Sequence, residues 1–234
     1  MSDLFGHDAP QPMGNALRDD APLADRLRPG SLAEVVGQEH LTGPDGAIGR
    51  MVAAGKLSSM ILWGPPGTGK TSIARLLADA VQMRFASISA VFSGVSDLKA
   101  AFAEAEKFAG AGRRTLLFVD EIHRFNRAQQ DGFLPFVERG VVTLVGATTE
   151  NPSFALNAAL LSRAQVLVLN RHDDTALDEL LTRAETEVGE PLPLDGDART
   201  ALKAMADGDG RYLLNCVETL YDLAGGETLG PQAL

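Results

Sequence analysis

The sequence predicts an α/β fold, in which a five-stranded parallel sheet flanked by helices is followed by a small all-helical subdomain. Short apolar runs alternate with stretches of helical periodicity as far as residue 170. The strands then stop, and three amphipathic helical patterns follow. The 234 residues, 45% of them hydrophobic, supply enough apolar side chains for a core of this size.

The predicted elements of the first 170 residues alternate regularly. The strands are short apolar runs, at 60–63, 84–89, 115–120, 141–147 and 165–169. The helices that precede or separate them have apolar residues three or four apart, at 46–54, 70–81, 97–108 and 127–138. Strands joined by helices run parallel, so we expect helices on both faces of the sheet.

Three further helical patterns predict the helical subdomain, at 174–188, 197–206 and 210–224. Prolines separate the first from the second, and a turn with two glycines separates the second from the third. The predicted organisation is a flexible tail (1–22), an α/β domain (23–170), a helical lid subdomain (171–226) and a C-terminal tail (227–234). The first tail is rich in proline and lacks periodicity.

Composition excludes several classes of protein. The net charge is −10, but residues 1–169 carry 16 basic and 17 acidic groups, against 5 and 14 in 170–234. Charge therefore neither supports nor excludes nucleic acid as a partner of the first domain. A single cysteine, Cys216, excludes an internal disulfide. No apolar run approaches the roughly 18 residues of a membrane helix, and the N-terminus has no basic leader, so we expect no membrane partner and a cytoplasmic location.

Residues 64–71 predict a phosphate-binding loop. They match G-x-x-x-x-G-K-[ST] at every fixed position, between a predicted strand and a predicted amphipathic helix. Backbone N–H groups of such a loop face phosphate oxygens. Lys70 would reach the β- and γ-phosphates, and the Thr71 hydroxyl would ligate Mg²⁺. The candidate nucleotide-binding residues of the loop are Gly64, Pro65, Pro66, Gly67, Thr68, Gly69, Lys70 and Thr71.

Two carboxylates end the predicted third strand. The apolar run 116–119 is followed directly by Asp120 and Glu121. Ligands of open α/β sheets bind at the carboxyl ends of the strands. Asp120 would therefore hold the Mg²⁺ shell, and Glu121 would orient and deprotonate the attacking water. The loop and the acidic pair together predict hydrolysis of a nucleoside triphosphate.

Three other positions are candidates for the same reaction. Thr148 and Thr149 follow the fourth strand, where a hydroxyl could position the water. Arg163 lies just before the fifth strand and could stabilise transition-state charge in a neighbouring subunit. Arg211 lies in the first turn of the last helix, behind Asp209 as its predicted N-cap, and could reach phosphate. Each is also a residue type common on solvated surfaces.

Taken together, these positions resemble the AAA+ ATPases of the clamp-loader-like group. The resemblance implies that 64–71 is the Walker A motif and that 120–121 belongs to Walker B. It implies sensor 1 at Thr149, or at the threonine before it, and the arginine finger at Arg163. It also implies sensor 2 at Arg211.

The segment 27–38 resembles the adenine-side box of the same group. Leu-Arg-Pro is followed there by Val36 and Gly37, which become candidate nucleotide-binding residues. Longer stretches, at 62–67, 119–126 and 146–154, are similar to a narrower family, the replication-associated recombination ATPases related to the Werner-helicase-interacting protein. The run Thr-Thr-Glu-Asn-Pro-Ser-Phe is more specific than the Walker motifs, and the resemblance covers about residues 22–224.

This resemblance implies an ATPase that uses ATP and Mg²⁺ in DNA replication and recombination at stalled or gapped forks. The implied partners are DNA with single-stranded ends or gaps, replication-fork proteins such as single-stranded-DNA-binding protein, and further copies of the chain. The implied location is the cytoplasm, at the nucleoid. The family continues into C-terminal helical domains associated with tetramer formation, and this sequence stops before them, as expected of a fragment or a shortened member.

Arginines near the third strand are the candidates for DNA contact: Arg124, Arg127, Arg139 and the pair Arg113-Arg114. Phe125 lies between the first two and would allow base stacking. Scattered arginines on an amphipathic helix are more often a solvated face.

Two alternative functions stay open. One is another ATPase of the same superfamily, either a clamp-loader subunit or a Holliday-junction branch-migration motor. The other is a slow ATP-gated protein-interaction module. His123 has no acid–histidine spacing typical of a metal site and is not assigned as a ligand.

Overall fold

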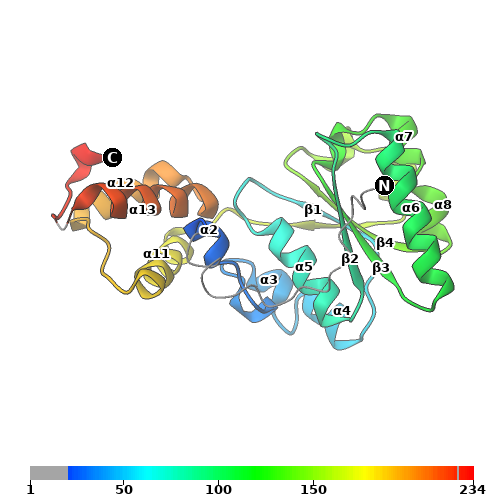
Figure 1. Ribbon diagram of the computed structural model, residues 1–234, viewed down its shortest axis with the longest axis horizontal. Helices are drawn as coiled ribbons and strands as arrows, with labels where there is room; N and C mark the ends of the chain where they lie inside the picture. The colour runs from blue at the N-terminus through cyan, green and yellow to red at the C-terminus, as the bar shows by residue number, and fades with distance from the viewer. Residues whose placement is uncertain (1–20, 226) are drawn as a thin grey trace, which may run out of the picture.

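The five strands pair into one parallel sheet, in the order β2-β3-β4-β1-β5 (Figure 1). The computed structural model describes residues 21–225 and 227–234. The strands are β1 (Met60–Trp63), β2 (Arg84–Ser89), β3 (Thr115–Asp120), β4 (Val142–Thr148) and β5 (Gln165–Val168). The five-stranded parallel sheet predicted from the sequence is confirmed.

Alternation along the strands sends apolar side chains into two separate cores. On one face, Met60 and Leu62 pack with α4 (Ala47–Ala53) and α5 (Lys70–Ala80). On the other face, Ile61 packs in a core with α6 (Val95–Gly110). Figure 1 shows the two groups of helices on opposite sides of the sheet. Both faces are therefore covered, as the near-continuous apolar strands require.

Residues 127–138 form two short helices, α7 (Arg127–Asp131) and α8 (Leu134–Glu138), so the prediction of one helix there is wrong. Pro135 has no N–H to donate to the Asp131 carbonyl, and its ring would collide with that carbonyl in a continuous helix. The break turns Phe133 into the core, where it is fully buried and its ring meets those of Phe102 and Phe125.

Short helical segments connect the remaining elements. They are α2 (Leu23–Arg26), α3 (Glu39–Thr42), α9 (Pro152–Ala155) and α10 (Ala158–Leu161), with 3-10 helices η1 (Leu32–Glu34), η2 (Ile122–Arg124) and η3 (Pro231–Ala233). α2 packs against the C-terminal helices (Figure 1), where Leu23 donates its N–H to Glu218 at 2.9 Å.

Three helices follow the sheet and form the helical lid, the name used here for α11 (Asp174–Val188), α12 (Gly196–Ala206) and α13 (Gly210–Ala224). An aspartate caps each helix: the side chains of Asp173, Asp195 and Asp209 accept hydrogen bonds from N–H groups of the first turn. Leucines of all three helices share one core. The predicted helical subdomain is confirmed, and the domain boundaries remain a prediction.

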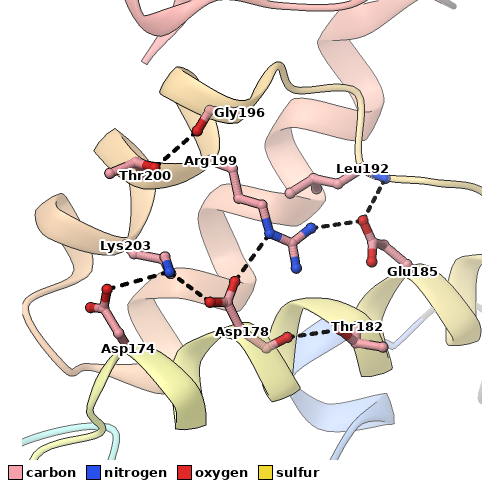
Figure 2. A network of polar contacts seen from close by, with 9 residues as sticks. All are labelled: Asp174, Asp178, Thr182, Glu185, Leu192, Gly196, Arg199, Thr200 and Lys203. Atoms are coloured by element: carbon pink, nitrogen blue, oxygen red, sulfur yellow. Dashed lines mark hydrogen bonds and ion pairs between the residues drawn. The ribbon is translucent and has the colours of Figure 1, made fainter.

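Ion pairs between α11 and α12 engage part of the acidic charge of the lid (Figure 2). Arg199 contacts Asp178 at 3.1 Å and Glu185 at 3.0 Å. Lys203 contacts Asp178 at 2.7 Å and Asp174 at 3.4 Å. The hydrogen bond from Lys203 holds the pKa of Asp178 below its usual value, and Asp178 raises the pKa of Lys203. These acids therefore serve helix packing inside the lid.

Two further sequence predictions concern the N-terminal tail and membrane-spanning helices. The flexible tail predicted for residues 1–22 lies outside the described residues, except for its last two. Among the helices of residues 21–225 and 227–234, none has the length and hydropathy of a membrane span.

Phe133→Ala is expected to lower the free energy of unfolding by about 3–5 kcal/mol, because it opens a cavity between two aromatic rings of the core. The matched control is Phe92→Ala, at a side chain that is 89% exposed. There we expect a change of less than about 0.5 kcal/mol. Urea unfolding followed by circular dichroism measures both, and equal losses would contradict the placement of Phe133.

Candidate functional site

A cleft opens between the carboxyl edge of the sheet and the helical lid. The loop before α5 and the first turn of that helix line it with residues 66–72, and α13 lines it with Gly210, Arg211 and Leu214. Residues between 24 and 36 line a further part of the wall.

The predicted phosphate loop is wrapped around the ammonium of Lys70. Lys70 Nζ donates to the carbonyl oxygens of Gly64 at 2.7 Å and Pro65 at 2.6 Å. These two residues are not among those that line the cleft. The other six predicted residues, from Pro66 to Thr71, line the cleft. Gly67 has a φ of +68°, and a Cβ there would overlap the carboxylate of Asp209 in the lid.

The ammonium of Lys70 is buried in surroundings that suit an anion. Desolvation lowers the pKa of its ammonium, although the charges of Glu121 and Asp120 oppose that shift. The ammonium has exchanged water for two carbonyl oxygens, which carry only partial charge. A phosphate oxygen would add a full negative charge at hydrogen-bond distance from the ammonium. The residues present therefore fit the phosphate group of a nucleotide.

The two carboxylates at the end of β3 line the same cleft. Asp120 is the last residue of the strand, and Glu121 turns the chain into η2 with a φ of +50°, which is uncommon for a residue with a side chain. The Thr71 hydroxyl and the Asp120 carboxylate are oxygen ligands of the kind that Mg²⁺ prefers. A site for the metal beside the phosphates thus fits these side chains.

The two threonines at the end of β4 have different surroundings. Thr148 is the last residue of the strand and is fully buried, and its Oγ1 lies 2.9 Å from Nδ1 of His123. Thr149 lines the cleft. Of the two, Thr149 has the position that a residue contacting the attacking water needs, so we keep it as the prediction for sensor 1.

The structure does not bring Arg163 to the cleft of its own chain. It precedes β5 and therefore lies at the amino edge of the sheet, whereas the cleft lies at the carboxyl edge. Its Nε contacts Glu138 at 2.7 Å and its Nη1 donates to the Ala159 carbonyl at 2.9 Å. From this edge, Arg163 would meet a phosphate only in another copy of the chain.

The lid brings Arg211 to the cleft. Arg211 lies in the first turn of α13, whose N-cap Asp209 accepts the Tyr212 N–H at 2.9 Å, as the sequence predicts. Its side chain lines the cleft together with the phosphate loop. The guanidinium is therefore placed to contact a bound phosphate from the lid side.

The two predicted adenine-side residues, Val36 and Gly37, have different places in the structure. Val36 lines the cleft. Gly37 does not; it has a φ of +72°, and a Cβ there would come within 2.8 Å of His172 Nδ1 and 3.3 Å of the Ala176 Cβ. Gly37 is thus needed where the chain passes close to His172.

His172 is a cleft residue that the sequence analysis missed. Its ring nitrogen Nε2 lies 3.2 Å from the Gly67 carbonyl oxygen. Its backbone N–H donates to the Gly208 carbonyl, and Gly210 packs against its ring. Burial lowers its pKa. A lone histidine after a strand gives no periodic signal, and the glycines that surround it come from three distant segments.

Of the DNA-contact candidates, Phe125 is buried, and the five arginines, Arg113, Arg114, Arg124, Arg127 and Arg139, are exposed. Phe125 is 2% exposed, because it packs against Phe133, so the prediction that it stacks on bases is wrong. Arg139 is held by Glu106 at 2.7 Å. Arg124 and Arg127 are exposed, beyond the carboxyl end of β3.

Comparison with known proteins agrees with this geometry. The family described as "ATPase family associated with various cellular activities (AAA)" matches residues 60–171. Replication-associated recombination protein A of Escherichia coli is 45% identical over 218 residues, which are 91% of this chain and 49% of that protein. The protein of the same name from Coxiella burnetii is 48% identical over 88% of this chain and 48% of its own length. ATPase WRNIP1 of Dictyostelium discoideum is 41% identical over 85% of this chain and 23% of its own.

Solved structures share the fold. A mutant of Thermotoga maritima RuvB superposes with a TM-score of 0.71 and 26% identity, over 88% of this chain and 70% of that one. A second Thermotoga maritima structure, titled RuvB Holliday junction branch migration motor, has a TM-score of 0.67 and 27% identity over 84% and 66%. The chain spans about half the length of the bacterial relatives above.

Lys70→Ala is expected to weaken ATP binding by at least about 100-fold, because hydrogen bonds to charged groups contribute roughly 1.5–3 kcal/mol each and Lys70 would make more than one. Lys56→Ala, at an exposed lysine after α4, is the matched control and should bind as the wild type does. Calorimetric titration with ATP and Mg²⁺ measures both. Retained micromolar affinity in Lys70→Ala would show that the phosphate site is misplaced.

Gly37→Ala should weaken ATP binding beyond the effect of backbone strain alone. Its control is Gly55→Ala, where φ is also positive (+63°) but nothing lies within 4 Å of the new Cβ. Both substitutions carry the strain of about 1–2 kcal/mol for a left-handed residue. Only Gly37→Ala displaces His172 from the phosphate loop, so equal ATP affinities in the two variants would contradict the role given to this contact.

Proposed function

Because residues 60–171 place this chain in the AAA family of ATPases, we propose that it binds ATP with Mg²⁺ in the cleft and hydrolyses it. The carrying observation is that Lys70, the carboxylates of 120–121 and Arg211 reach one cleft from three separate elements. The loop N–H groups and Lys70 would bind the phosphates, and Thr71 and Asp120 would hold the metal. Bound Mg²⁺ neutralises charge on the phosphates.

Glu121 would act as the base in this reaction. Its carboxylate lines the cleft close enough to Lys70 to oppose the lowering of that residue's pKa. From there it can orient a water and take its proton, and the Thr149 hydroxyl can hold the same water. Arg211 would contact the γ-phosphate, and loss of that contact after hydrolysis would let the lid move relative to the sheet.

We propose that this ATPase acts in replication and recombination maintenance, at stalled or gapped forks. Its similarity to proteins named for replication-associated recombination, over about nine-tenths of the chain, supports this role. The proposed effector is DNA with single-stranded ends or gaps, and single-stranded-DNA-binding protein is a proposed partner. The candidates for DNA contact are the exposed Arg113, Arg114, Arg124 and Arg127, and Arg139, which is exposed but paired with Glu106. The location would be the cytoplasm, at the nucleoid.

A branch-migration motor is the second candidate, because the two RuvB structures share the fold at 26–27% identity. A slow ATP-gated interaction module is less favoured, because such a module can do without a base and Glu121 is present in the cleft. The form of DNA that stimulates turnover separates these functions.

Glu121→Gln is expected to bind ATP normally while turnover falls by about 100-fold or more, the usual contribution of a general base. Steady-state hydrolysis at fixed salt, with and without a duplex bearing a single-stranded gap, uses this variant as the blank. We expect the gapped duplex to stimulate the wild type. Hydrolysis by Glu121→Gln at the wild-type rate would remove this residue from the mechanism, and stronger stimulation by a four-way junction would favour the motor.

Arg163 is expected to act between copies, and mixing two inactive variants tests this. Arg163→Ala keeps the whole cleft but lacks the arginine, and Lys70→Ala keeps the arginine but lacks the phosphate lysine. An arginine of this kind contributes about 10³-fold or more to phosphoryl transfer, so each variant alone should be nearly inactive. Mixing them at concentrations where light scattering shows self-association should restore turnover. A mixture as inactive as its parts would contradict action in trans.

A further inference from the structure

His123 connects the proposed catalytic base to the loop after β4. It lies in η2, two residues after Glu121, and its side chain is only 4% exposed. Three polar side chains surround its two ring nitrogens: Glu121 and Thr148 at Nδ1, and Glu150 at Nε2. The cluster therefore joins two segments, 121–123 and 148–150, at the carboxyl edge of the sheet.

The distances are those of direct contacts. Nδ1 of His123 lies 3.2 Å from a carboxylate oxygen of Glu121 and 2.9 Å from Oγ1 of Thr148. Nε2 lies 3.3 Å from a carboxylate oxygen of Glu150. Carboxylate oxygens only accept, so each ring nitrogen is the donor when it bonds to the carboxylate that faces it, and both nitrogens donate at once in the doubly protonated ring. Thr148 closes the cluster, because its Oγ1 also accepts the Glu150 N–H at 3.0 Å.

The Glu121 carboxylate needs such an anchor. It extends into an open cleft and is 29% exposed, so several rotamers would otherwise be open to it. Among the described residues, His123 is the side chain that pairs with it. A general base must stay within hydrogen-bond reach of its water, and a displacement of about 1 Å can cost on the order of 100-fold in rate.

We propose that His123 is a positioning residue, which holds Glu121 toward the cleft and is itself held by Thr148 and Glu150. This inference rests on the proposed ATPase function, with Glu121 as the base. It also gives different roles to Thr148 and Thr149, the two threonines at the end of β4. Thr148 supports the histidine from within the structure, and Thr149 faces the cleft.

His123→Ala is expected to lower kcat about tenfold or more, while the KM for ATP and the affinity for ATP stay unchanged, because the phosphate loop is intact. His123→Asn places an amide nitrogen near the position of Nδ1 and should recover much of the loss. His123→Gln reaches toward the position of Nε2 and should recover less. A role confined to packing would not separate the two amides.

Controls keep this test separate from the test of the proposed function. If the wild type hydrolyses no faster than Glu121→Gln, the ATPase proposal fails before His123 is considered. His40→Ala, at an exposed histidine bonded to the Val168 carbonyl, should keep the wild-type kcat. With an active wild type, a His123→Ala enzyme of unchanged or higher kcat, or one whose loss lies in KM, would overturn the inference.

Glu150→Ala provides a second route, since the Glu150 side chain is 59% exposed and its removal leaves the core intact. Thermal unfolding shows whether each variant is folded at the assay temperature. If His123→Ala is unfolded at the assay temperature, the result for Glu150→Ala decides the test. We expect a several-fold lower kcat with unchanged KM, and an unchanged kcat would overturn the inference.

Discussion

The site depends on the interactions of one buried group, the ammonium of Lys70. Two carbonyls of the loop before α5 hold it, and two carboxylates at the end of β3 lie close enough to counter the lowering of its pKa by burial. The sheet order makes this possible, because β3 and β1 flank β4 and all three end at the same edge. A phosphate group of a bound nucleotide would give the Lys70 ammonium a charged hydrogen-bond acceptor.

Side chains at the start of the lid and just before it lie close to this loop. Asp209, which caps α13, leaves no room for a Cβ at Gly67, and His172 lies against the carbonyl of the same glycine. Within the lid, Arg199 and Lys203 bind acidic side chains of α11 and fix α12 against it. A change at the phosphate loop would therefore reach the lid as a movement of a stiff group of helices.

The sequence predicts the parts of this site that depend on local order along the chain. The loop 64–71, the strands beside it and the capped helix that carries Arg211 follow from a motif, periodicity and an N-cap. The prediction that Phe125 stacks on bases is wrong, because Phe125 packs against Phe133, which the break at Pro135 turns into the core. Contacts of His172 and of His123 join segments far apart in sequence, and a single sequence carries no signal for such pairs.

Hydrogen exchange in the presence and absence of ATP and Mg²⁺ tests whether one cleft is shared by the sheet and the lid. Residues 66–71 and the start of α13, 210–214, lie on the two sides of that cleft. If a nucleotide binds between them, both segments will become protected together, and neither will in Lys70→Ala. Protection of the loop with no change at the start of α13 would contradict a binding site made jointly by the two parts.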